Sequence, residues 1–444
     1  MNVQQFSDLL RQMHQALNDE PLPEQAGFHA VTLTMSLQDG SPLLAWLASQ
    51  PVYPQFYWQH RQDDEEAAVC GQVRVFGDIA HAEDFLQRHD VDDSVRLWGL
   101  NAFEQHPAAK TNAAAAFLFL PRIALLRQGG RLRLRVNLCS DTSLRDDARD
   151  AQDFLRRLLP PQPLPTLHTR IEATRHCPDR QQWIDLLHLA LADIAAGQME
   201  KVVPARASVL SLDRPLLATT LMAASRAANY RCYHFMLAFA PHQAFLGSSP
   251  ERLYRRRQTR LETEALAGTV ASDHDDEKAA VLADWLMNDV KNQCENMLVV
   301  DDICQRLHQA ALTLDVMPPE IVRLRKVQHL RRTIQATLRS GTDSECLHLL
   351  QPTAAVAGLP RAAARAFLAR HEPFHRGWYA GSAGYLSRQQ SEFSVALRSA
   401  SVAERQLTLY AGAGIVAGSD PEQEWQELEN KAAGLKSLLE DAIS

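Results

Sequence analysis

The chain of 444 residues is predicted to adopt an α+β fold, because helix and strand signals alternate along it without regular βαβ spacing. Strand-like runs occur at 71–76 and 131–139 in the first part, and at 392–399 and 406–410 near the end. With 46% hydrophobic and 22% charged residues, the composition is that of a globular protein long enough for one large domain or two.

Charge and cysteine usage limit the partners and the compartment. The net charge is −7, the pI is near 6.2, and basic residues are scattered, which argues against a nucleic-acid partner. The first twenty residues indicate an amphipathic surface helix, and the most apolar run, 113–121, is too short to span a bilayer, so no membrane association is expected. Seven widely spaced cysteines without a C-x-x-C pair favour reduced thiols in the cytoplasm. Nothing in the sequence fixes an oligomeric state.

A proline-rich connector divides the chain. Residues 158–167, "LLPPQPLPTL", contain four prolines and can form neither a helix nor a central strand. We therefore expect an N-terminal part at 1–165 and a second region at 166–444. After the connector, Asp179 is a predicted N-cap for a helix that buries Trp183 and Leu187 and ends at Gly197, and a strand begins at Lys201.

Two segments in the second region have simple structural interpretations. Residues 277–307 are predicted to form one long helix, and the acidic "SDHDDE" before it lacks the spacing and the glycine of a calcium loop. The helix "RAAARAFLAR" runs into His371-Glu372-Pro373-Phe374-His375, a literal H-E-x-x-H. Its proline breaks the helical turn that would align two zinc-binding histidines, so the helix is expected to end there in a loop.

The stretch from Gly412 to Ala417 reads G-x-G-x-x-A, the pattern of a dinucleotide-binding turn. A helix must begin at those glycines for its N–H groups to face a pyrophosphate. Here the helix signals come later, with Asp420 as N-cap and Pro421 at the first position, and too few residues follow for a second strand. The pattern therefore does not predict a nicotinamide or flavin site.

The helix after Asp420 carries a different chemical signal. Glu424, Glu427 and Lys431 fall on one face at i, i+3 and i+7. Such carboxylates can form a solvated stripe, or they can hold a cation. Because the preceding glycine turn offers backbone donors for an anion, the arrangement suits a carboxylate substrate bound with magnesium.

An ordered set of motifs carries a resemblance to a known family. The set comprises "MEKVVPARA", "GSSPERL", "LAGT", "KNQCENMLVVDDI", "VQHL", "LQPTAAVAGLPR", "WYAGSAGY", "FSVALRSA" and "YAGAGIVAGSDPEQEWQELENKA". It resembles the chorismate-utilising enzymes, which include anthranilate synthase large subunits, aminodeoxychorismate synthase, salicylate synthase and isochorismate synthases. With "LAWLASQPVYPQFYWQHR" and "LWGLNAF", the resemblance covers nearly the whole chain and is strongest to the isochorismate synthases of menaquinone biosynthesis.

The resemblance implies a fold and a reaction. The family fold is a single α+β unit of two packed β-sheets with helices outside. The implied activity is a Mg²⁺-dependent isomerisation, in which water adds to C2 of chorismate as the C4 hydroxyl leaves. By motif position, Lys201 is the base and Glu251 the acid. A lysine acts so only where its surroundings favour the neutral amine, and a glutamate only where its pKa is raised.

The remaining family positions also match residues of this chain. Glu295 and Glu427 match the magnesium ligands, with Glu424 as a neighbouring carboxylate. Arg398 and the backbone N–H of Gly414 match the groups that hold a substrate carboxylate. The other expected substrate contacts are Gly268, Thr269, His329, Ala355, Tyr379 and Lys431.

Within the family, Lys201 and Ala355 favour a water-using member over an ammonia-using one, and no tryptophan-binding signature is evident. Salicylate synthase, which also eliminates pyruvate, shares these residues and stays an alternative, as does a catalytically silent chorismate sensor. Three departures from the family pattern affect detail: Cys294 before a metal ligand, Pro204 after Lys201, and "ALAGT" in place of "PIAGT".

Overall fold

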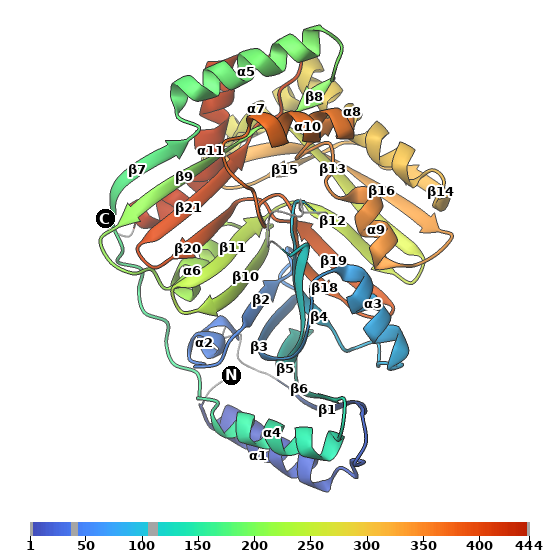
Figure 1. Cartoon of the computed structure of the whole chain (residues 1–444). Coiled ribbons are helices and arrows are strands. Elements are labelled where there is room, and N and C mark those ends of the chain that lie inside the picture. The colour runs from blue at the N-terminus through green and yellow to red at the C-terminus, as the bar shows by residue number, and fades with distance from the viewer. Residues whose placement is uncertain (1–2, 37–42, 105–113, 442–444) are drawn as a thin grey trace.

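The computed structural model of the chain describes residues 3–36, 43–104 and 114–441. In this part of the chain, nineteen strands form one continuous antiparallel network that folds into two layers (Figure 1). The first layer runs, in hydrogen-bonded order, through β7 (Ile171–Cys177), β9 (Ala205–Leu212), β21 (Gln406–Gly412), β20 (Ser399–Ala403), β11 (Gln243–Ser249), β10 (Tyr233–Ala240), β2 (Gln55–Gln59) and β3 (Glu65–Phe76).

The long strand β5 (Ala116–Gln128) connects this layer to the rest of the network. One edge of β5 pairs with β3, and the other pairs with both β4 (Leu97–Asn101) and β6 (Arg131–Ser140). From β4 the second layer continues through β18 (Ser382–Leu386), β19 (Gln390–Val395), β12 (Arg252–Arg257), β13 (Arg260–Ala271) and β16 (Val327–Leu338), and the last of these also pairs with β14 (Ala311–Val316) and β15 (Glu320–Arg323). The predicted fold class and its two packed sheets are therefore confirmed, with β5 joining them.

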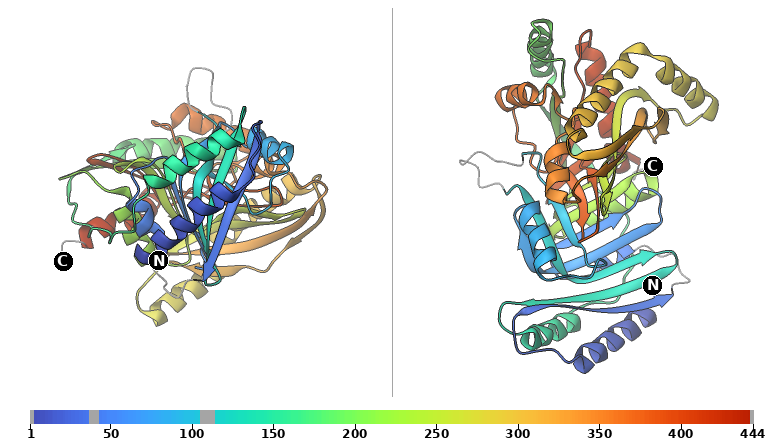
Figure 2. Two further views of the ribbon diagram at one scale, coloured as in Figure 1. Left: turned by 90° about the horizontal axis from the view of Figure 1, so that it is seen from below. Right: turned by 90° about the vertical axis from the view of Figure 1, so that its right-hand side faces the viewer.

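Alternating side chains in β2 show how the layers are filled. Phe56 and Trp58 are fully buried in the core between the two layers, whereas Tyr57 points to the other face of the first layer. That outer face is covered by α1 (Val3–Asp19), α2 (Leu43–Ala48), α4 (Leu144–Arg156), α6 (Ala218–Ala228) and α11 (Pro421–Asp441). Figure 2 shows α1 and α4 lying against the outermost strands, β6 and β1 (Gly27–Ser36).

The predicted N-terminal elements are present within the described residues. Helix α1 buries Phe6, Leu9, Met13 and Leu17 on one face, as an amphipathic surface helix does. The proline-rich segment 158–167 forms neither helix nor strand. Strands from both sides of it share one network, so the division at residue 165 stays a prediction. Among the described residues, no helix is long and apolar enough to cross a membrane.

Helices gather at one end of the two layers, at the top of Figure 1. They include α5 (Arg180–Ala195), α7 (Asp276–Asn288), α8 (Val290–Leu307) and α10 (Arg361–His371), together with part of α11. The short pair β8 (Lys201–Val202) and β17 (Gly358–Leu359) lies at the same end. On the flank, α3 (Ile79–Arg88) packs against α9 (Asp343–Leu350).

Three local features test the predicted element boundaries. Asp179 closes a capping box at the start of α5, and Asp420 accepts hydrogen bonds from the N–H groups of Glu422 and Gln423, so both predicted N-caps are confirmed. The single helix predicted over 277–307 is wrong. Asp289 adopts an extended conformation and caps α8 through the N–H of Asn292, which separates α7 from α8.

The strand predicted over 392–399 is also interrupted. Strand β19 ends at Val395 and β20 begins at Ser399. Between them, Arg398 has a φ of 47°, in the left-handed region that non-glycine residues seldom adopt. Backbone strain of this kind tends to occur at functional positions, and Arg398 is one of the predicted substrate contacts.

Candidate active site

A cavity lined by residues of both layers and of helices α8 and α11 brings most of the predicted residues together. Its empty volume, including solvent at the mouth, is about 630 Å³, a size suited to a small molecule. Eleven of the predicted residues line it: Glu251, Gly268, Thr269, Glu295, His329, Ala355, Tyr379, Arg398, Gly414, Glu427 and Lys431. Of the other two, Lys201 contacts the lining residue Glu295, and Glu424 lies one helical turn before Glu427 on α11.

Glu251 is a buried acid in the turn between β11 and β12. Its side chain is almost fully buried, and no described residue makes a hydrogen bond to its Oε1 atom. Burial and the nearby carboxylate of Glu264 raise the pKa of Glu251 to about 8, against the opposing effect of Lys201, Arg398 and Lys431. Glu251 therefore carries a proton at neutral pH, and this is the form that a general acid requires.

Lys201 is fixed by the strands around it. The β8 residues pair with β17 on one side, and the N–H of Val202 donates to Ile415 on the other. The Lys201 side chain has no exposed surface, and its Nζ donates to Glu295 Oε1 at 3.0 Å. A lysine ammonium is thus buried against a single carboxylate at the wall of the cavity.

Glycines permit this close packing. A Cβ atom at Gly414 would lie 2.5 Å from Glu295 Oε1 and 3.0 Å from Lys201 Cε. A Cβ atom at Gly412 would lie 2.8 Å from the hydroxyl of Tyr379. The glycines therefore leave room for side chains that approach the backbone closely, and neither glycine has a positive φ.

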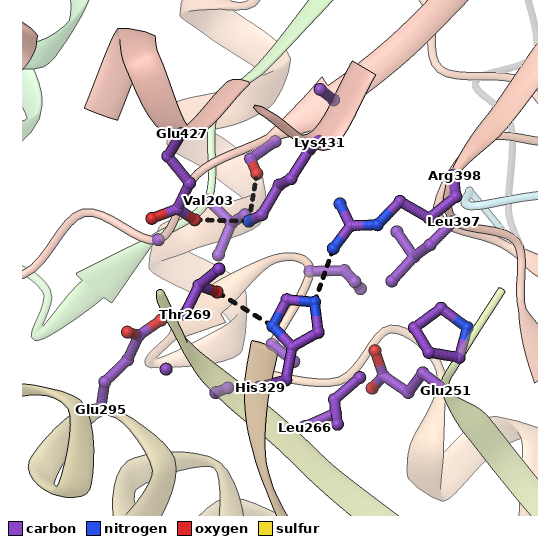
Figure 3. A pocket seen from close by; sticks show the side chains of 18 of the residues that line it. Val203, Glu251, Leu266, Thr269, Glu295, His329, Leu397, Arg398, Glu427 and Lys431 are labelled. Atoms are coloured by element: carbon purple, nitrogen blue, oxygen red, sulfur yellow. Dashed lines mark hydrogen bonds and ion pairs between the residues drawn. The ribbon is translucent and has the colours of Figure 1, made fainter. Parts of the chain in front are cut away.

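His329 links two strands to the strained arginine (Figure 3). Its Nε2 lies 2.6 Å from Arg398 Nη2, and its Nδ1 lies 3.0 Å from Thr269 Oγ1. Because arginine can only donate, Nε2 accepts and the ring proton is on Nδ1. Burial and the positive charges of Arg398 and Lys431 hold the pKa of His329 well below its usual range. The neutral imidazole therefore orients the guanidinium in the cavity.

Each of the three predicted metal-binding carboxylates contacts a lysine. Glu295 pairs with Lys201, Glu427 pairs with Lys431 at 2.5 Å, and Glu424 lies 3.4 Å from Lys291. Among the described residues, no group of three metal-binding side chains converges closely enough to hold an ion.

The same carboxylates nevertheless fit a hard divalent cation in charge and in donor type. Burial, Glu427 and Glu295 all raise the pKa of Glu424, to about 7, so the three negative charges lie close enough to repel. Mg²⁺ prefers oxygen donors and retains several waters, so it needs few protein ligands.

Helix α8, which carries Glu295, is anchored by two asparagines, Asn292 and Asn296. Neither was among the residues predicted from the sequence. Asn292 Oδ1 accepts from the N–H of Thr269, beside Gly268, whose φ of 88° needs a glycine. Asn296 is fully buried, and its Nδ2 lies within 3.0–3.2 Å of three carbonyl oxygens in β13 and β16. Their spacing of four residues on one helix face was the signal available in "KNQCENMLVV".

The H-E-x-x-H segment has a structural role that spacing alone did not reveal. Helix α10 ends at His371, as expected, and Glu372 is buried beside Arg376. Arg376 also donates to the carbonyls of Val203 and Val356, and Glu372 accepts from the N–H of Ala205. This Glu372–Arg376 clamp fixes the segment that follows Lys201.

The departures from the family pattern are accommodated. Pro204 lies between β8 and β9, where its missing N–H removes no ladder bond, and its carbonyl accepts from Ala413. Cys294 is exposed on α8. In the third departure, "ALAGT", the three residues before Gly268 are buried. The ladder between β13 and β16 shifts register there, between Leu266 and Thr269.

Comparison with known proteins identifies the class of protein. The family described as chorismate binding enzyme matches residues 15–440, so the chain belongs to this family, as predicted. A curated relative, the isochorismate synthase MenF of Escherichia coli (strain K12), is 52% identical over 438 residues, which are 99% of this chain and all of the relative.

Solved structures agree. The structure of the menaquinone-specific isochorismate synthase MenF from Escherichia coli superposes with a TM-score of 0.92 at 53% identity, covering 98% of this chain and 99% of that one. Anthranilate synthase component I from Streptococcus pneumoniae superposes with a TM-score of 0.63 at 18% identity, covering 92% of each chain. At that identity the second match supports the fold alone.

We predict that Arg376→Met lowers the free energy of unfolding by about 3–5 kcal/mol, because it leaves the carboxylate of Glu372 buried and unpaired. Chemical denaturation measures this loss. The control is Arg88→Met, which breaks an exposed pair with Asp84 at the same i,i+4 spacing and should cost less than about 1 kcal/mol. Equal effects of the two substitutions would contradict the clamp.

Proposed function

We propose that the chain is an isochorismate synthase that converts chorismate to isochorismate in the menaquinone branch. Two observations together support the proposal: the groups at the cavity and the similarity to a known enzyme. A protonated, buried Glu251 and a buried Lys201 flank one small cavity. The chain also matches an enzyme of that name at 52% identity over 99% of its length. The enzyme class, an isomerase, is that predicted from the sequence.

The reaction requires one proton to be removed and another to be supplied. Lys201, in its neutral form, takes a proton from the water that attacks C2, and Glu251 gives its proton to the hydroxyl that leaves C4. One water enters and one leaves, so the product is an isomer of the substrate. The ion pair of Lys201 with Glu295 corresponds to the lysine after proton transfer. Each proton-transfer role is typically worth about 10²–10⁴-fold in rate.

Substrate orientation falls to other groups that line the cavity. Chorismate has two carboxylates, and Arg398, held by His329, would bind one of them together with the backbone N–H of Gly414. Tyr379 and Lys431 would contact the ring substituents. Gly268, Thr269 and Ala355 would shape the same cavity.

Mg²⁺ is the proposed cofactor. Glu295 and Glu427 would hold it, with Glu424 nearby, and it would neutralise the second substrate carboxylate. The protein's own contribution is to place these carboxylates on α8 and α11, which approach each other at the cavity. We place the enzyme in the cytoplasm, because all seven of its cysteines are free thiols.

We predict that the purified chain forms isochorismate from chorismate with Mg²⁺ present, and that Lys201→Ala and Glu251→Ala each reduce kcat by about 10²-fold or more. Product analysis by chromatography measures this. Glu422→Ala, at an exposed position on α11, is the control and should retain activity. Salicylate with pyruvate would instead identify the lyase alternative, and unchanged chorismate would identify a sensor.

Metal binding gives a second prediction, independent of turnover. Calorimetric titration with Mg²⁺ should show affinity lowered by at least about tenfold, or about 1.4 kcal/mol, in Glu295→Gln and in Glu427→Gln. The reason is that each change removes a negatively charged oxygen donor. Glu422→Gln should bind as the unaltered chain does, and unchanged affinity in both site variants would refute the assigned ligands.

A further inference from the structure

A second buried carboxylate lies behind the proposed acid, outside the cavity. Glu264 is on β13, and both oxygens of its carboxylate are bound by the two terminal nitrogens of Arg61. Arg61 Nη1 also donates to the carbonyl of Pro250 at 3.0 Å, and the N–H of Arg252 lies 3.3 Å from Glu264 Oε2. Glu264 is therefore tied to the residues immediately before and after Glu251.

This carboxylate is ionised. Burial by itself raises the pKa of Glu264, but Arg61, Arg252 and Arg331 outweigh it and bring the pKa below its ordinary value. The other two arginines are farther from Glu264: the Nη1 atoms of Arg252 and Arg331 lie 3.7 Å and 3.8 Å from its Oε1. Arg61 is thus the main counter-ion, and it is itself only slightly exposed.

Positive charges surround Glu251 on the side of the cavity. Lys201 on β8, Arg398 before β20 and Lys431 on α11 all favour the ionised form of Glu251. All three cations have proposed roles at the cavity: Lys201 as the base, and Arg398 and Lys431 as substrate contacts. His329, neutral on β16, contributes no charge. The negative charge of Glu264, which is bound to the residues flanking Glu251, acts on Glu251 in the opposite sense.

We propose that Glu264 is a positioning residue for Glu251: an ionised carboxylate, held by Arg61, whose negative charge opposes ionisation of Glu251. The inference rests on the proposed role of Glu251 as the acid. It gives Arg61, which follows β2, a part in the reaction although Arg61 itself does not line the cavity. If the buried ion pair had only a structural role, neutralising either member should have the same effect on activity.

Neutralising Glu264 should lower the pH of the alkaline limb, whereas neutralising Arg61 should not, and this difference separates the proposal from a structural role. Glu264→Gln removes the negative charge and leaves Arg61 positive, so the alkaline limb of kcat/KM, set by Glu251, should move down by about one pH unit. Arg61→Met leaves Glu264 charged beside Arg252 and Arg331, so the limb should stay in place or move up. Glu264→Asp keeps the charge and should retain a limb near that of the unaltered chain.

Glu262→Gln is the matched control, because Glu262 is two residues away on β13 and pairs with Arg252 and Arg255. It should leave the limb unmoved. Parallel losses of activity at every pH in Glu264→Gln and Arg61→Met, with no shift of the limb, would overturn the proposal. If Glu264→Gln does not fold, Arg61→Met still decides, because a downward shift in that variant contradicts the proposed sign.

A readout without turnover separates this inference from the proposed function. Infrared difference spectra between each background and its Glu251→Gln derivative report the carbonyl stretch of the protonated Glu251 carboxyl group as pH is raised. We expect this band to disappear about one pH unit lower with Glu264→Gln, and an unmoved band overturns the inference. A band that shifts while the alkaline limb does not would support the inference and refute Glu251 as the acid.

Discussion

The ion pair between Lys201 and Glu295 is the interaction on which the site depends most. A fully buried ammonium is costly unless a carboxylate compensates it, and Glu295 is that carboxylate. The pair joins a two-residue strand to helix α8, elements separated by 94 residues in sequence. A Cβ atom at position 414 would force both side chains of the pair to shift. Asn296 and the Glu372–Arg376 clamp then fix the two elements that the pair connects.

Charge balance explains how one small cavity can hold several ionised groups. Three carboxylates at the site each have a lysine partner: Glu295 with Lys201, Glu424 with Lys291 and Glu427 with Lys431. Glu251 has no such partner among the described residues and is protonated instead. Burial and like charge keep one carboxyl group protonated, while a lysine is held at a carboxylate, and this is the division that the proposed acid and base roles require.

Local patterns in the sequence predicted much of this arrangement. Asp179 and Asp420 were found as N-caps because capping depends on residues within one turn. The face formed by Glu424, Glu427 and Lys431 followed from helical periodicity. Residue roles came from motif resemblance, and the cavity does bring Glu251, Glu295 and Arg398 together.

What the sequence could not predict depends on distant contacts. The break at Asp289 is favoured by a single side-chain cap inside an otherwise helical pattern. The left-handed Arg398 is held by a histidine 69 residues away. The partners of the carboxylates also lie far along the chain, as with Lys291 and Glu424. Hydrogen bonds across such separations leave no periodic signal in either segment.

A double-mutant cycle on Lys201 and Glu295 tests the central claim most directly. Unfolding by denaturant would be measured, with a chelator present, for Lys201→Met, Glu295→Gln and the combined variant. Each single change leaves one buried charge unpaired, whereas the combination leaves none. The account predicts that the combined variant loses less stability than the sum of the two, by about 1–3 kcal/mol. Losses that add to within about 0.5 kcal/mol would contradict it.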